Sequence, residues 1–173
     1  LRSGHAPASI LVVEPFEAQR DKLVATFGIA PQPAADGRLS DAATVVWAVK
    51  PQFFAEAAPP CAPFVGRALQ LSVMAGIRSD AIARACGTTL AEARIVRSMP
   101  NTPALIGQGI AGLYAREAVS AAERQTAEAL LAPTGRTLWV AREQDLDAVT
   151  ALSGSGPAYV FYFVEAMMAA ATQ

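Results

Sequence analysis

Three observations predict an α/β fold built on a mostly parallel β-sheet. Short apolar runs alternate along the chain with segments of helical spacing, an order typical of strand–helix–strand units. The run at residues 9–15 stays apolar until it ends at an acid and a proline, which is the pattern of a buried parallel strand. Hydrophobic residues make up 53% of the 173 residues and charged ones 17%. This composition supports a packed core in one domain, or in one domain and part of another.

The expected elements follow one another along the whole chain. Strands are expected at residues 9–15, 30–34, 44–49, 68–73, 93–97, 109–115 and 137–140. Helices are expected at residues 16–27, 80–86, 120–131, 143–152 and 157–173. Gly28 and Gly87 end the first two helices, Ser79 is a suitable N-cap for the second, and Ser120 forms a capping box with Glu123 at the third.

Two further segments are less regular. Residues 36–43 are expected to be a polar connection or a short helix. Residues 52–64 are expected to be helical only in part, because Pro59, Pro60 and Pro63 would each remove a backbone donor and clash with the preceding turn.

Residues 98–112 carry the first candidate functional motif. Two prolines bracket Asn101 and Thr102, and three glycines follow, so the stretch is neither a long helix nor a central strand. A shaped loop directly after a strand lies where open α/β sheets place their ligand contacts. Asn101 offers an amide donor and a carbonyl acceptor to a carboxamide or a small polar substrate. The alternative is an Asx turn in which Asn101 caps its own backbone, and this stretch alone favours that alternative.

A second motif, D-A-V-T-A-L-S-G-S-G-P-A-Y at residues 147–159, is a small-residue loop leading into a helix that starts at a proline. Together with A-V-K-P-Q (48–52), S-V-M-A-G-I (72–77) and M-P-N-T-P-A (99–104), it closely resembles pyrroline-5-carboxylate reductase, the enzyme that makes proline. The likeness covers nearly the whole chain in the family's order. It implies a Rossmann-type, doubly wound sheet in residues 1–142 and the start of an all-helical dimerisation and substrate domain in residues 143–173.

One element of the dinucleotide-binding pattern is not in the sequence. Such a domain begins with a strand, a G-x-G-x-x-G turn and a helix, and an acid ends the next strand. Glu14 fits the acid, but the Gly-rich turn is missing. Residues 1–5 are expected to end the first helix, and nothing matches the family's later Gly- and Thr-containing substrate loop. We therefore expect a sequence truncated at both ends, with a sheet that has lost its middle strand; a genuine fragment is the alternative.

The resemblance implies NADP(H) as the cofactor, whereas Glu14 favours NAD(H), because an acid in this place hydrogen-bonds the ribose 2′-hydroxyl. A solvated acid at a helix start is the alternative role for Glu14. The resemblance places cofactor contacts at Ala48, Val49, Lys50, Pro51, Met74, Ala75 and Asn101. Gly76 would let the backbone approach a ligand closely. A solvated lysine and an ordinary strand-end turn are the alternatives for Lys50 and for residues 74–76.

The resemblance also implies the residues that hold the substrate. Asn101 and Thr102 are expected to act as catalytic residues that orient nicotinamide and substrate. Ser153 and Ser155 stand at a helix start, which suits an anion or a carboxamide; helix packing through small residues is the alternative. Glu143 matches an acid near the substrate pocket, and its alternative is an acid favoured by the helix dipole.

Charge and composition exclude several other classes of protein. A net charge of −1 and a pI near 5.8 give no electrostatic case for nucleic acid or a membrane surface. Cys61 and Cys86 lack metal-site spacing, and His5 is the sole histidine, so neither a zinc site nor a Ser-His-Asp triad is expected. The start lacks the pattern of a signal peptide, which predicts a cytoplasmic protein. The apolar segment at residues 158–172 is too short to span a bilayer, and we expect a buried or intersubunit helix there.

The implied reaction is NAD(P)H-dependent hydride transfer to the imine carbon of 1-pyrroline-5-carboxylate, which gives L-proline in the last step of proline biosynthesis. A protonated imine is already electrophilic, so positioning should matter more than a strong general acid. The resemblance implies a homodimer or a higher homo-oligomer. The rivals are another NAD(P)-dependent imine or β-hydroxyacid-type dehydrogenase and a non-catalytic fragment or paralogue that acts as a binding module.

Overall fold

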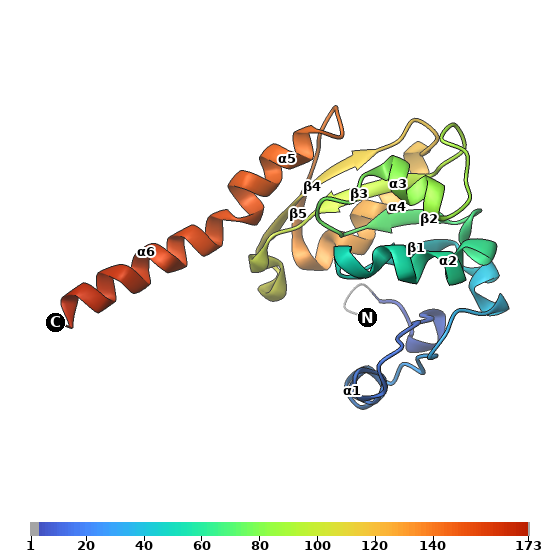
Figure 1. Ribbon diagram of the computed structural model, residues 1–173, viewed down its shortest axis with the longest axis horizontal. Helices are drawn as coiled ribbons and strands as arrows, with labels where there is room; N and C mark the ends of the chain where they lie inside the picture. Colours follow the sequence, from blue (N-terminus) through green and yellow to red (C-terminus); the bar gives the residue numbers. More distant parts are fainter. Residues whose placement is uncertain (1–3, 173) are drawn as a thin grey trace.

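The chain forms a five-stranded sheet in a computed structural model that describes residues 4–172 (Figure 1). Its strands are β1 (Thr44–Trp47), β2 (Leu69–Ser72), β3 (Ile95–Met99), β4 (Gly109–Ala115) and β5 (Gly135–Trp139), which lie in that order across the sheet. All neighbouring pairs are parallel except β3 and β4, which are antiparallel. The expected mostly parallel α/β architecture is confirmed.

Helices cover both faces of this sheet. On one face, α2 (Phe54–Val65) and α3 (Ser79–Ala85) enclose a core in which Trp47 meets Phe54 edge to face, with ring centroids 5.2 Å apart. On the other face, α4 (Ala121–Leu131) packs Ala127 and Leu131 over Leu71, Val96 and Leu113. The central strands β2 and β3 are therefore buried on both sides, whereas β1 and β5 at the edges of the sheet are only partly buried.

The remaining elements lie around this sheet. They are α1 (Glu17–Phe27), α5 (Asp145–Val149), α6 (Gly156–Ala171), a π-helical turn (Thr150–Gly154) and the 3₁₀ turns Pro7–Ser9, Gly37–Asp41, Pro51–Phe53, Thr102–Ile106 and Ala132–Thr134. Figure 1 shows α1 and α6 projecting away from the sheet on different sides. The side chains along α6 are exposed, Phe161 and Phe163 among them. No helix in the described part of the chain is long and apolar enough to cross a membrane.

The strands predicted at residues 9–15 and 30–34 are wrong. Within residues 4–172 these segments share one parallel bridge, Val13 to Gln32, where the Glu14 amide donates to the Gln32 carbonyl at 2.9 Å and the Gln32 amide to the Val12 carbonyl at 2.8 Å. Neither segment joins the five-stranded sheet. A strand is buried only when neighbours flank it, so the apolar side chains of residues 9–15 remain partly exposed. Of residues 1–5, the predicted end of a helix, residues 1–3 lie outside the described part.

The prediction of a broken helix at residues 52–64 is also wrong, because α2 runs through Pro59, Pro60 and Pro63. All three prolines lie on its exposed side, so water can reach the carbonyl groups that lose their partners. Its other side buries Phe54, Ala58 and Val65. Packing of this apolar face offsets the cost of the prolines.

Ser79 does not cap the helix it begins. Arg78 is the N-cap residue of α3, without a capping side-chain hydrogen bond, and Ser79 is the first helical residue. The predicted helix at residues 143–152 is α5 followed by the π-helical turn. The helices at residues 16–27, 120–131 and 157–173 are confirmed as α1, α4 and α6, except that residue 173 lies outside the described part, and the capping box of Ser120 and Glu123 is present.

Candidate functional site

Three of the predicted ligand-contacting segments begin where strands end. Residues 48–51 follow β1, residues 74–76 follow β2, and Asn101 comes shortly after β3. These three strands are mutually parallel neighbours, so their carboxyl ends share one edge of the sheet. Ala75 and Gly76 are exposed there, and Gly76 has a φ of +74°, a conformation that favours glycine. This edge is the candidate site.

Asn101 ties the two candidate motifs together. Its Nδ2 donates to Ser153 Oγ at 3.0 Å, and its Oδ1 accepts from the Ile110 amide at 3.0 Å. The side chain thus spans its own loop and the small-residue loop rather than capping its own turn, so the Asx-turn alternative is wrong. Thr102 next to it is exposed and begins the 3₁₀ turn that leads towards β4.

The small-residue loop lies close against the end of β3. A Cβ atom on Gly154 would sit 2.8 Å from Met99 Cε, so the glycine permits this approach. Ser155 is the residue before α6, its amide donates to the Thr150 carbonyl at 2.9 Å, and its side chain is half-buried, as is that of Ser153. The loop therefore packs against the side chain of Met99 at Gly154, and the two serines flank this glycine.

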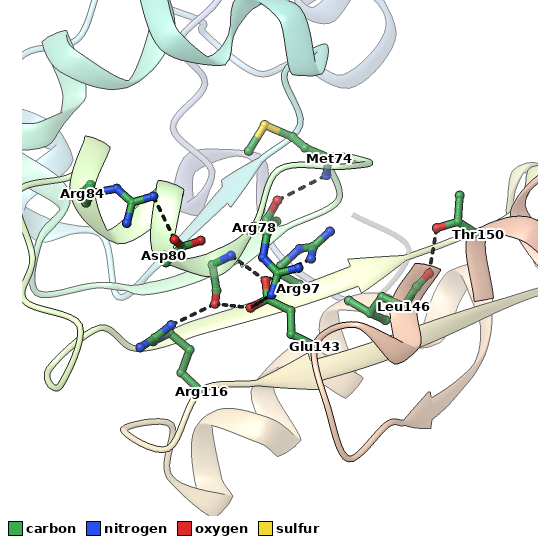
Figure 2. A network of polar contacts seen from close by, with 11 residues as sticks. Met74, Arg78, Asp80, Arg84, Arg97, Arg116, Glu143, Leu146 and Thr150 are labelled. Carbon is green, nitrogen blue, oxygen red and sulfur yellow. Dashed lines mark hydrogen bonds and ion pairs between the residues drawn. The ribbon is translucent and has the colours of Figure 1, made fainter. Parts of the chain in front are cut away.

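Glu143 lies in a network of arginines and a serine (Figure 2). Its Oε1 accepts from the Ser79 amide at 2.6 Å and from Arg97 Nη1 at 3.0 Å, and its Oε2 accepts from Ser79 Oγ at 2.8 Å. Arg78 lies farther away, at 3.9 Å, and Arg116 donates to Ser79 Oγ at 3.0 Å. Only 10% of the Glu143 side chain and 6% of the Arg97 side chain are exposed.

These contacts keep Glu143 ionised. Burial by itself raises the pKa of this carboxyl, but the hydrogen bonds from Ser79 and the charge of Arg97 outweigh it, and the net pKa is lowered. Sequence reasoning missed Ser79 and Arg97 as its partners, and Arg116 as the residue that donates to Ser79. The available signal was Arg97 itself, a charged residue inside an apolar strand, which needs a partner when buried.

The other predicted cofactor residues differ in exposure. Ala48, Lys50 and Pro51 are exposed, Val49 is half-buried, and Met74 is buried, with its amide donating to Ser72 Oγ at 3.3 Å. Glu14 lies before α1, outside the sheet, where its carboxylate accepts from the Phe16 amide at 2.9 Å. Phe16 is the N-cap residue of α1, so Glu14 lies close to the start of that helix. Among residues 4–172 no cluster of His, Cys, Asp and Glu is suited to a metal ion.

Comparisons with known proteins agree with this arrangement. Residues 143–173 match the family model described as pyrroline-5-carboxylate reductase dimerisation. The chain is 39% identical over 171 residues to a pyrroline-5-carboxylate reductase of Haemophilus influenzae, a match covering 98% of this chain and 62% of that protein. The chain therefore spans about three fifths of the length of the curated relatives it matches.

Solved structures give the same result for the fold. A pyrroline-5-carboxylate reductase from Coxiella burnetii superposes with a TM-score of 0.85 at 32% identity, covering 99% of this chain and 63% of that one. A Plasmodium falciparum pyrroline carboxylate reductase with NADP bound superposes with a TM-score of 0.74 at 26% identity, covering 85% and 55%.

Proposed function

The chain belongs to the pyrroline-5-carboxylate reductase family, and from this premise we propose that its protein reduces 1-pyrroline-5-carboxylate to L-proline with a reduced nicotinamide dinucleotide. The observation that carries the proposal is the hydrogen bond from Asn101 to Ser153, which joins the two family motifs. It does so at the sheet edge where α/β folds bind ligands.

The residues at this edge suit the nicotinamide end of such a cofactor. Ala75 and Gly76 present a small, exposed backbone on which a flat ring can lie, and residues 48–51 leave the neighbouring strand at the same edge. When bound, the reduced nicotinamide supplies the hydride. The phosphate-binding Gly-rich turn is not among the residues of this sequence, so the proposal rests on the nicotinamide side.

We assign the protein a role of orientation rather than proton transfer. Asn101 is held from two sides, by Ser153 and by the Ile110 amide, and its Nδ2 carries a second hydrogen that can meet a carbonyl or carboxamide oxygen. Ser153 contributes the hydroxyl group that accepts from Asn101, and we assign the hydroxyl groups of Thr102 and Ser155 to the same site. Fixed polar groups of this kind accelerate a reaction by holding the imine carbon in line with the hydride donor.

Cofactor preference and assembly complete the proposal. We take NADP(H) as the cofactor, as in the Plasmodium relative solved with NADP, with NAD(H) as the alternative because of Glu14. We also propose a homodimer or a higher homo-oligomer that works in the cytoplasm. The support is α6, whose exposed apolar side chains need a partner surface, in a region matched by a dimerisation family model.

The test is a reductase assay on the protein as its source organism makes it, after its intact mass has been compared with the 18.0 kDa of these residues. Loss of nicotinamide absorbance and formation of L-proline are measured together, with NADPH and with NADH. A panel of other cyclic imines and of β-hydroxyacids separates the rival dehydrogenases. Absence of proline with both dinucleotides would refute the proposed activity.

A further inference from the structure

Residues 143–155, which we name the linking segment, join the last strand to α6. In the described part of the chain, the side-chain hydrogen bonds that tie this segment to distant parts of the protein belong to Glu143 at its start and to Ser153 near its end, while Asp145 pairs with Arg142 directly before the segment. Between them, Leu146 is buried and Val149 packs against Gly112 of β4. The segment is thus fixed by the polar contacts of Glu143 at its start, by that of Ser153 near its end, and by apolar packing in the middle.

One face of β3 and its extension meet the linking segment three times. Residues 97, 99 and 101 are two apart, and alternate residues of an extended chain point to the same side. Arg97 binds Glu143, Met99 lies against Gly154, and Asn101 binds Ser153. The ion pair and the candidate catalytic residue are therefore two ends of one contact surface.

The surroundings of the Glu143–Arg97 ion pair make it costly to break. Both carboxylate oxygens of Glu143 are engaged by Ser79 and Arg97, so the group faces the protein. Arg97 is buried, and removal of its counter-charge would leave an uncompensated charge inside the protein. The pair therefore resists separation of the linking segment from the sheet.

We propose that Glu143 and Arg97 are positioning residues: their ion pair sets the place of the linking segment on β3 and thereby the contact of Asn101 with Ser153. This inference rests on the proposed function for its catalytic consequence. It gives Glu143 a role other than that of a substrate ligand.

Glu143→Gln is the test variant, and Glu123→Gln is its matched control. Glu123 likewise accepts from the amide and hydroxyl of a serine, Ser120, and pairs with an arginine, Arg94, at 3.0 Å, but it does so at the start of α4. The two substitutions remove the same kind of contact at two places. A general loss of stability should therefore affect both variants.

We expect Glu143→Gln to lower kcat/KM for 1-pyrroline-5-carboxylate by about 10-fold to 100-fold, as small misplacements of catalytic groups do. The KM for the dinucleotide should change less than kcat/KM does, since of its predicted contacts only Asn101 touches the linking segment, whereas residues 48–51 and 74–76 are outside it. Hydrogen exchange should rise at residues 101–110 and 143–155 in this variant. Glu123→Gln should change neither the kinetics nor the exchange of these residues.

Glu143→Asp, which keeps the charge on a shorter arm, should recover part of the exchange protection and serves if Glu143→Gln does not fold. A kinetic loss without faster exchange at residues 101–110 would make Glu143 a direct ligand and overturn the proposal. Unchanged kinetics and exchange would overturn it as well. The exchange measurement needs no substrate, so it decides on the ion pair even if the reductase assay itself is negative.

Discussion

Gly112 in β4 lies directly under α5, and replacing it with alanine should push that helix away from the sheet. An added Cβ would lie 2.9 Å and 3.0 Å from the two methyl groups of Val149 and 3.3 Å from Leu146 Cδ2. Carbon atoms in contact normally stand about 3.5–4.0 Å apart, so α5 must move by about 0.6 Å. The β-branched Val149 has few other rotamers through which to yield.

The expected cost follows from two opposing effects. Overpacking a well-packed site costs about 1–3 kcal/mol, while replacing a strand glycine with alanine returns about 0.5–1 kcal/mol. We therefore expect Gly112→Ala to lower the free energy of unfolding by about 1–2 kcal/mol, measured by urea denaturation with an unchanged slope. Because α5 belongs to the linking segment, reductase turnover should fall as well.

Two further variants test whether the clash with α5 causes the expected loss of stability. Gly66→Ala is the matched control, because the nearest atoms to its added Cβ stand at 3.7 Å and 3.9 Å and its φ of −61° suits alanine, so stability should be unchanged or higher. Adding Val149→Ala to Gly112→Ala should make the two effects strongly non-additive, since the clash partner is then gone. A Gly112→Ala protein as stable as wild type would refute the reasoning.

The remaining predictions concern the site and its charges. Asn101→Ala should lower kcat by about 10-fold or more while the fold remains, because Ser153 and the Ile110 amide lose their common partner. Equal turnover rates for the variant and the wild type would show that Asn101 has no catalytic role. Glu14→Ser should raise the preference for NADPH over NADH if this acid meets the ribose, as ratios of kcat/KM would reveal, and an unchanged ratio would leave Glu14 its helix-start contact alone. The pKa values of Glu143 and Glu123 are lowered in the folded protein, so both carboxylates stabilise the fold above the unfolded carboxyl pKa of 4.5. This stabilisation is lost as the pH falls below that value. Urea titrations at several pH values should show the free energy of unfolding decrease as the pH falls, and this decrease should be smaller in Glu143→Gln than in the wild type. Equal pH dependence in the wild type and the variant would contradict this expectation.

Local sequence patterns predicted most of the elements around the site but few of their partners. All five strands of the sheet were predicted to within a few residues, because each contains or adjoins a short run rich in apolar residues that turn residues flank. The capping box of Ser120 and Glu123 was predicted because both of its members lie within one turn. In contrast, residues 9–15 have the same apolar pattern as the true strands, yet which neighbour they pair with is a property of the whole fold.

The candidate site shows the same division. The resemblance singled out Asn101 and Ser153, but their contact joins residues 52 positions apart, which local reasoning cannot supply. Ser79 has the composition of an N-cap, yet its hydroxyl donates to Glu143, 64 positions away. The prolines of α2 have strong local effects that the buried face of the helix overrides.

The antiparallel step between β3 and β4 has a consequence for the order in which the site forms during folding. Because β4 runs back alongside β3, the Asn101 loop directly connects two neighbouring strands. The contact of Asn101 with the Ile110 amide therefore closes a chain loop of nine residues, whereas its contact with Ser153 closes one of 52 residues. The longer closure costs about 1.5 kcal/mol more in chain entropy. We therefore expect the Asn101 loop to form together with β3 and β4 while the linking segment is still undocked. The contact between Asn101 and Ser153 should form afterwards, when the linking segment docks onto this preformed loop.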